Sequence, residues 1–292
     1  MRHIITISGK DSLATLIWQR ELDPSLPYEF VFNDVRAELP ETYEWLDTVE
    51  HKLGIEIKRI GLSLTDIIAQ RGILPTPRIR FCTSDAKIRP MDRFIGKDKA
   101  IVYFGLRADE PARIGAIESN KLTPRYPLRD AGIGLATVYA IVGKYDLMPP
   151  AFFWERLYRE VVRQYGEPVG WPDWMRARIF AGRSRPNCSF CFFQRRYEWV
   201  WLLETHPDLF AQAEKIEAET GNGPELRRST GIQWIAEGYA LSKIRQNAEM
   251  LFEKRVKAVG KLITAAAQSD LFADALDEMD AAQTSCGLLC GK

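Results

Sequence analysis

The chain has 292 residues, of which 46% are hydrophobic and 27% are charged, as in an ordinary globular protein. Its formal net charge of +1 excludes a global field that attracts nucleic acid, so any such contact needs a local patch. No run approaches the roughly 20 apolar residues of a membrane span, and the N-terminus lacks a signal-peptide pattern. We therefore expect a cytoplasmic protein with no membrane partner, whose five cysteines are thiols or metal ligands rather than disulfides.

The first dozen residues predict a strand, a tight polar loop and a helix. Residues 2–7 are a short β-branched run, and an apolar, helix-compatible segment begins at Leu13. A loop between them places backbone N–H groups and a helix N-terminus at one point, which attracts anions and phosphate above all. Gly9 lets the backbone approach a ligand closely, and Lys10 adds positive charge. The other polar side chains of this loop are Ser8, Asp11 and Ser12.

The elements that follow alternate between strands and helices up to about residue 124 and are mainly helical beyond it. This alternation predicts βαβ units and a mostly parallel sheet. Loops at Ser8, Asn33 and Gly105 each follow a strand, so they should share the rim at which ligands bind to such sheets. The further expected strands are residues 28–32, 55–60 and 100–104. The expected helices are residues 38–51, 63–69, 87–94, 136–145, 152–165, 195–204, 208–219 and most of 232–268.

Two segments near this rim are rich in charge. Residues 78–90 carry four arginines and lysines in a loop-to-helix setting, and such cations can hold phosphate or sulfate. Residues 105–113 follow a strand and offer two arginines and two carboxylates. From the residues alone, three plainer interpretations stay open: a capped turn at residues 8–12, a solvated basic loop, and a surface ion-pair cluster.

Four motifs in order resemble the phosphoadenosine phosphosulfate reductase-like family of the adenine nucleotide α-hydrolase superfamily. They are residues 8–12, 33–42, 82–90 and 105–110. The first is similar to the superfamily's pyrophosphatase loop (PP-loop), although it is one glycine short. The resemblance implies an α/β, parallel-sheet, Rossmann-like fold with a helical C-terminal part. We expect a nucleotide-binding domain over residues 1–125, a mainly helical cysteine-bearing region over 126–284, and a tail over 285–292.

The resemblance also implies roles for individual residues toward an adenine nucleotide, ATP. Mg²⁺ should bridge its phosphates, with Asp11 as a direct or water-mediated ligand. The implied cofactor-binding residues are Ser8, Gly9, Lys10, Asp11, Ser12, Asn33, Asp34, Arg80 and Gly105. The implied catalytic residues, which hold phosphates and neutralise charge, are Lys10, Asp11, Ser12, Lys87 and Arg107.

Cys188 and Cys191 form a Cys-x-x-Cys unit that is open to several interpretations. A thioredoxin-like redox pair needs a preceding strand, which is not evident. A zinc site needs four ligands, and here there is no second such unit and only His206 nearby. Buried structural thiols are a further alternative.

A [4Fe-4S] cluster is the interpretation that we favour, with zinc as the alternative. Iron–sulfur clusters accept thiolates from scattered positions. Cys82 lies in a motif of the family near the nucleotide rim and is the expected third ligand, with Cys286 or Cys290 as the fourth. Cys82, Cys188 and Cys191 should then converge near that rim, because a sulfur carrier is useful only where the activated substrate can reach it.

Aromatic residues surround the Cys-x-x-Cys unit in the sequence. Aromatic side chains in helices are usually core, but a cluster beside arginines also suits stacking of an unpaired base. This pattern is the sequence's indication of a nucleic-acid substrate. The aromatic residues are Trp171, Trp174, Tyr197, Trp199 and Trp201, and the arginines are Arg176, Arg178, Arg183 and Arg185.

The resemblance implies an ATP pyrophosphatase that adenylates an acceptor for sulfur insertion, preferably in DNA phosphorothioation or else in RNA thiolation. A cysteine desulfurase would then be the sulfur-donor partner. The first alternative is a sulfonucleotide reductase with Cys286 as nucleophile, whose tail here keeps Cys-Gly-Leu but lacks the family's Glu and His. The second alternative is a non-catalytic subunit that senses nucleotide or binds a partner.

Overall fold

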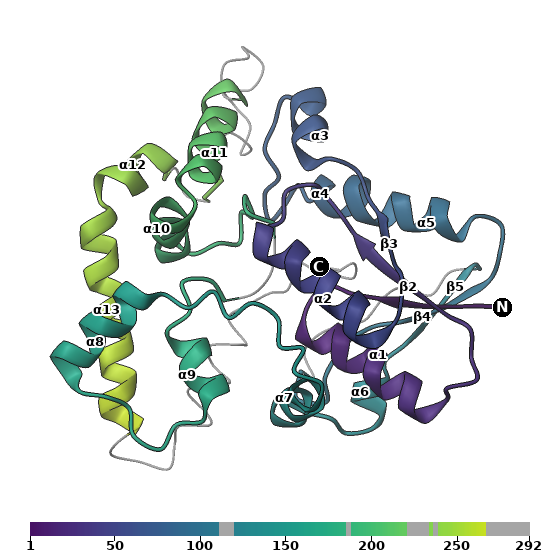
Figure 1. Cartoon of the computed structure of the whole chain (residues 1–292). Coiled ribbons are helices and arrows are strands. Elements are labelled where there is room, and N and C mark those ends of the chain that lie inside the picture. The colour runs from purple at the N-terminus through teal and green to yellow at the C-terminus, as the bar shows by residue number, and fades with distance from the viewer. Residues whose placement is uncertain (111–119, 185–187, 221–233, 236–238, 267–292) are drawn as a thin grey trace.

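The computed structural model describes residues 1–110, 120–184, 188–220, 234–235 and 239–266 (Figure 1). Its centre is a five-stranded sheet of order β3-β2-β1-β4-β5 in which every neighbouring pair is parallel. This confirms the predicted Rossmann-like parallel sheet. The strands are β1 (Arg2–Thr6), β2 (Tyr28–Asn33), β3 (Ile57–Ile60), β4 (Ala100–Tyr103) and β5 (Leu122–Arg125).

The fifth strand was not predicted, and Pro124 is the reason. Proline has no N–H to donate to a neighbouring strand, so a proline in the sequence argues against a strand at that position. β5 pairs only with β4 and forms the edge of the sheet, where a proline is tolerated, and Pro124 stands opposite Val102. The sheet therefore extends to Arg125.

Helices cover both faces of the sheet (Figure 1). Neighbouring residues of β1 point to opposite faces, so Ile5 joins one buried cluster with Leu13 while Ile4 joins another with Met91. Val138 belongs to the first cluster, although it follows residue 125. The first cluster draws on α1 (Lys10–Leu22), α2 (Pro40–Leu53), α6 (Pro127–Asp130) and α7 (Leu135–Lys144), whereas α5 (Arg89–Ile95) lies on the other face.

The helix predicted at residues 87–94 begins earlier and is irregular. It runs from α4 (Phe81–Thr83) through a π-helical turn (Ser84–Ile88) into α5. Proline lacks an N–H and its ring collides with the carbonyl four residues back, so Pro90 disturbs the α-helical ladder. The Arg89 N–H donates five residues back, to the Ser84 carbonyl, and the Ala86 carbonyl accepts from the Leu62 N–H at 3.3 Å. Lys87 lies within this turn, a type found often at functional sites.

The remaining helices form a second layer that shares its core with the first. Leu39, Ile67 and Cys82 belong to one buried cluster with Trp199 and Val256 from the C-terminal helices. Among the described residues, no helix is both long and apolar enough to cross a membrane. These helices are α3 (Leu64–Arg71), α8 (Glu155–Tyr165), α9 (Asp173–Ile179), α10 (Arg196–Thr205), α11 (Pro207–Thr220), α12 (Leu241–Gln246) and α13 (Ala248–Ala266).

Candidate functional site

The loop between β1 and α1 has the form of an anion site. The hydroxyl of Ser12 accepts the N–H groups of Ser8 (2.8 Å) and Gly9 (3.0 Å) and donates to the Gly9 carbonyl (2.9 Å). Lys10, Asp11 and Ser12 are the first residues of α1, and N–H groups in that first turn have no intrahelical acceptor. Since Ser12 fixes the loop, the start of α1 is pre-organised for an anion.

Gly105 brings the end of β4 against the start of α1. A Cβ atom at Gly105 would lie 2.6 Å from both the Asp11 carbonyl carbon and the Ser12 nitrogen. Only glycine allows this approach, since any side chain would push the helix away. The loops after β1 and β4 therefore share one rim, as predicted.

Arg107 is buried at this rim, with 5% of its side chain exposed. Its guanidinium binds Asp11 Oδ1 (3.1 Å) and Asp109 Oδ1 (2.7 Å), and Glu110 Oε1 lies 4.0 Å away. Burial acts to raise the pKa of Asp11, but Lys10 and Arg107 outweigh it and hold that pKa below its ordinary value. Burial likewise opposes the charge of Arg107, yet the carboxylates raise its pKa. Arg107 thus lies where it was expected, but it contacts carboxylates of the protein rather than facing an open anion site.

The end of β2 supplies the second part of the rim. Asp34 Oδ1 accepts the Arg36 N–H (2.7 Å) and the Tyr43 hydroxyl (2.8 Å), so this carboxylate is held in place. The Asn33 side chain is 8% exposed, and its Oδ1 has no hydrogen-bond partner in the described part of the chain. Burying an unsatisfied acceptor is costly, and a donor on a ligand would satisfy it. Asn33 and Asp34 therefore lie at the end of β2 on this rim, and their contact with a nucleotide stays a prediction.

The Cys-x-x-Cys segment docks on the same end of the sheet. The Ser189 N–H and hydroxyl both donate to the Ala37 carbonyl, at 2.6 and 2.7 Å. Cys188 Sγ lies 3.7 Å from Glu38 Oε1. The structure thus brings Cys188 to the loop that follows β2, about 150 residues away in the chain.

Glu38 was not predicted as a site residue. Its side chain is 8% exposed, and burial raises the pKa of its carboxyl, although Lys87 and Arg183 act in the opposite direction. Lys87 therefore lies within electrostatic reach of the β2 rim. Glu38 could be recognised from the sequence only by its place in a motif, because its burial depends on the distant Cys188 segment.

Three of the predicted cluster ligands lie in the described part of the chain. Cys82, Cys188 and Cys191 are buried and form no disulfide there, and the first two belong to one buried cluster. Over the described residues, no group of three or more His, Cys, Asp or Glu side chains is arranged to hold a metal ion. His206, the candidate zinc ligand, instead places Nε2 2.9 Å from Glu41 Oε1. Cys286, the expected fourth ligand, lies outside the described residues.

Much of the predicted aromatic surface is core. Trp199 and Trp201 are 0% and 3% exposed, whereas Trp171 and Trp174 are half-buried.

Several of the predicted cationic side chains contact groups of the protein itself. Arg80 stacks on the Phe193 ring with its guanidinium carbon 5.5 Å from the centroid. The further residues Arg176 and Arg183 contact Glu167 and the Cys188 carbonyl respectively, and Arg185 lies outside the described residues.

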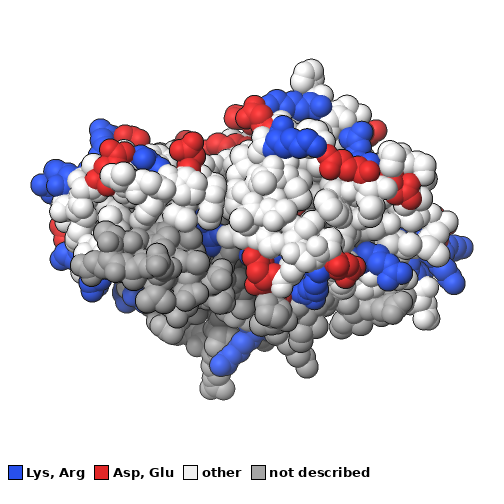
Figure 2. Space-filling view, turned by 90° about the horizontal axis from the view of Figure 1, so that it is seen from below, with Lys and Arg blue, Asp and Glu red and all other residues white. Residues whose placement is uncertain are grey.

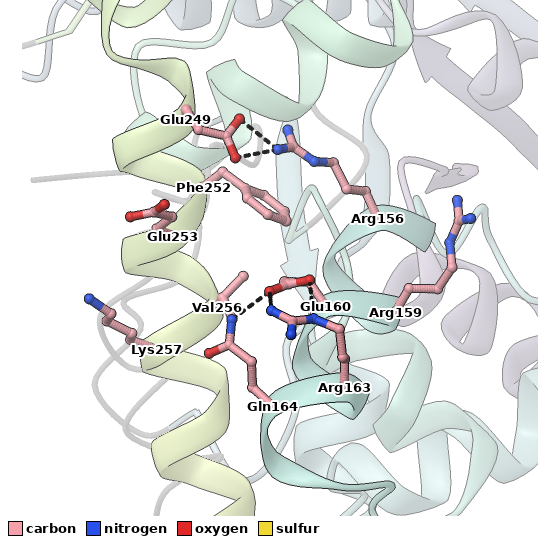
Figure 3. Close-up of a pocket in the computed structure, with 10 residues that line it drawn as sticks. All are labelled: Arg156, Arg159, Glu160, Arg163, Gln164, Glu249, Phe252, Glu253, Val256 and Lys257. Atoms are coloured by element: carbon pink, nitrogen blue, oxygen red, sulfur yellow. Dashed lines mark hydrogen bonds and ion pairs between the residues drawn. The ribbon is translucent and has the colours of Figure 1, made fainter.

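A surface pocket of about 700 Å³ opens elsewhere, between α8 and α13 (Figure 3). Its walls are charged, but the charges neutralise one another. Arg156 binds Glu249 at 2.5 Å, and Arg163 binds Glu160 at 2.5 Å. None of the predicted site residues lines this pocket. The candidate site is therefore the rim at the carboxyl ends of β1, β2 and β4.

Comparison with known proteins gives a match over the part of the chain that contains this rim. Residues 2–122 match the model of the phosphoadenosine phosphosulfate reductase domain family. The matched stretch covers less than half of the chain. It contains the loop at residues 8–12, the β2 rim and Arg107. A search of curated proteins finds no match.

Two solved structures are similar to the chain at low identity. One is the phosphoadenylyl-sulfate reductase of Candida auris in its phosphate complex, with 16% identity, a TM-score of 0.37, and coverage of 49% of this chain and 72% of that one. The other is the U34-tRNA thiolase NcsA of Methanococcus maripaludis with its [4Fe-4S] cluster, with 12% identity, a TM-score of 0.36, and coverage of 85% and 80%. At these scores neither similarity supports a conclusion about activity.

Proposed function

We propose that the protein is an ATP pyrophosphatase that adenylates an acceptor for sulfur insertion, preferably on DNA and alternatively on RNA. The observation that carries this proposal is the Ser12-fixed loop at the start of α1, with Gly105 packed against it. Such a loop binds phosphates through backbone N–H groups and the helix N-terminus. The nearby Cys188 segment supports a role in sulfur chemistry, because it places a thiol at the same end of the sheet.

In the proposed reaction an acceptor oxygen attacks the α-phosphorus of ATP, and the bond to the β-phosphate oxygen breaks to release pyrophosphate. A sulfur nucleophile then attacks the activated atom of the acceptor, and AMP leaves with the original oxygen. The chain's part is to position phosphates and neutralise developing charge, through the start of α1 and Lys10. Mg²⁺ would arrive with the phosphates of ATP. The sulfur would come from a cysteine desulfurase as a persulfide, whose S–S bond a thiol reductant cleaves after the attack.

No step above depends on a cluster, because among the described residues no three or more potential ligands are arranged to hold a metal ion. A [4Fe-4S] cluster on Cys82, Cys188, Cys191 and Cys286 stays a hypothesis. Iron, sulfide and zinc analysis of anaerobically purified protein tests this hypothesis. Stoichiometric iron and sulfide that disappear in Cys188→Ala would support it, whereas one zinc per chain would replace it with the zinc alternative.

Pyrophosphate release from ATP tests the proposed function, with single-stranded and duplex DNA and RNA as acceptors. Ser12→Ala should lower the rate, and the matched control Ser25→Ala should not, because Ser25 is exposed and bonds only to Asp23 beyond the far end of α1. Thiol-dependent sulfite release from phosphoadenosine phosphosulfate would instead identify a reductase. ATP binding without turnover under every condition would leave a nucleotide-sensing subunit.

A further inference from the structure

Two aromatic rings from different helices are stacked beside the phosphate loop. The rings of Tyr139 on α7 and Trp174 on α9 have centroids 4.9 Å apart and planes 25° apart. Lys10 Nζ lies 6.0 Å from the Tyr139 centroid. Both aromatic residues are half-buried, so part of each side chain is open to solvent. Tyr139 lies in an apolar helical stretch and gave no signal in the sequence.

A chain of polar contacts ties Tyr139 to the phosphate loop. Asp109 Oδ2 accepts the Leu135 N–H at 2.8 Å, at the start of α7. Asp109 Oδ1 binds Arg107, which in turn binds Asp11 in the loop. Tyr139 follows Leu135 by about one helical turn. The stack is therefore held in a fixed position relative to Lys10 rather than lying at an unrelated place on the surface.

The chain has a formal net charge of only +1, which gives no broad attraction for a polyanion. Figure 2 shows positive and negative side chains interspersed over the described part of the face seen from below. Arg178 follows Trp174 by four residues, so the two lie on the same side of α9. A nucleic acid that binds here would gain little from general attraction to phosphates. It would depend on stacking, which tolerates any base sequence because every base has a π-face.

We propose that the Tyr139–Trp174 stack holds an unpaired base of the acceptor nucleic acid. Trp174 stacks on the Tyr139 ring and Lys10 lies over the same ring. The base would therefore stack on Trp174, with the adjoining backbone directed along Tyr139 toward the loop that binds the phosphates of ATP. This inference rests on the proposed function in one respect, that the acceptor is a nucleic acid. It adds the recognition element, which is one unpaired nucleotide rather than a duplex.

The test is binding of a fluorescein-labelled single-stranded DNA of mixed sequence, an RNA of the same sequence, and the DNA duplex. Trp174→Ala should weaken single-strand binding by about 5- to 150-fold, the range for losing one base–aromatic stack. Tyr139→Ala should weaken it less, because it removes only the ring on which Trp174 stacks. Tyr139→Phe should bind as the parent does, since the ring remains. Tyr145→Ala is the matched control, because Tyr145 ends α7 at its opposite end and also lies beside a lysine, Lys144. ATP affinity should change less than twofold in all variants.

Three outcomes would overturn the inference. These are equal weakening in Tyr145→Ala, tighter binding of the duplex than of the single strand, and a loss of ATP affinity that matches the loss of nucleic acid. The last result would mean that the stack contacts the nucleotide itself. Thermal melting shows whether a variant is unfolded. If an alanine variant is unfolded, single-strand binding by Trp174→Phe and the quenching of Trp174 fluorescence by the single strand decide instead. Single-strand binding through the stack without pyrophosphate release would contradict the proposed function and leave this inference standing.

Discussion

The buried carboxyl groups on the two sides of the rim have pKa values shifted in opposite directions. On the β4 side, Arg107 lies among Asp11, Asp109 and Glu110, and the pKa of Asp11 is lowered. On the β2 side, burial raises the pKa of Glu38, which lies against Cys188. One side therefore holds paired, ionised groups and the other favours a neutral carboxyl beside a thiol. Under the proposed function, we expect phosphates to bind on the first side and sulfur chemistry to involve the second.

Arg107→Ala should have the largest effect, because it removes the cation that three carboxylates share. Removing one partner of a buried ion pair costs about 3–5 kcal/mol, so we expect a matching fall in the free energy of unfolding and loss of ATP binding. Chemical denaturation and calorimetric titration with ATP measure the two effects. Arg20→Ala is the control, since Arg20 on α1 donates to the Leu53 carbonyl. A stability loss as small as that of the control would show that the β4 side is not charge-paired in solution.

Ser12→Ala should have the next largest effect, and on binding more than on folding. It removes the acceptor for the Ser8 and Gly9 N–H groups and the donor to the Gly9 carbonyl, so the loop is no longer held in the shape that suits an anion. Leaving such groups unsatisfied costs roughly 1–3 kcal/mol, so ATP affinity should fall about tenfold or more. Titration calorimetry with ATP measures it. Unchanged affinity would remove this loop from the mechanism.

The pH dependence of stability should have opposite signs on the two sides. The lowered pKa of Asp11 contributes stability above its ordinary value of 3.8, and this contribution is lost as pH falls below that value. The raised pKa of Glu38 makes the folded state bind more protons, so its contribution falls as pH rises above its ordinary value of 4.5. In metal-free protein, Asp11→Asn should flatten the acid side of the stability curve and Glu38→Gln should raise stability relative to the parent near neutral pH. Shifts of the same sign in both variants would contradict the contrast.

Ser189→Ala should have the smallest effect. The substitution removes one hydrogen bond to the Ala37 carbonyl and leaves the backbone N–H bond to the same oxygen. We expect a loss of about 1 kcal/mol in unfolding free energy, together with faster reaction of Cys188 with a thiol reagent as the segment loosens. ATP affinity should stay constant, which separates the β2 side from the β4 side. An equal fall in ATP affinity would mean that the two sides act as one site.

The sequence predicted those features that depend on neighbouring residues. Alternating apolar patterns located β1 to β4, and the run from Ser8 to Ser12 located the anion loop, because strand, turn and helix start are local. The features that it missed depend on distant partners. β5 was missed because it contains Pro124, and only its pairing with β4 identifies it as a strand. Tyr139 was missed because only its contacts with Lys10 and Trp174 distinguish it from other apolar helix residues. The sequence predicted that the arginines would bind anions. It did not predict that Arg107 would pair with carboxylates of the protein itself.

The irregular helix caused by Pro90 has a consequence for how the protein unfolds. Its first part places Phe81 and Cys82 in the large cluster shared with the C-terminal helices, and its last part places Met91 and Ile95 in the cluster beneath the sheet. One continuous helical segment therefore packs into two hydrophobic cores. Unfolding of either core would remove part of the packing of this segment and so destabilise the other core. The nucleotide-binding and cysteine-bearing parts should therefore behave as a single cooperative unit, with one calorimetric transition rather than two.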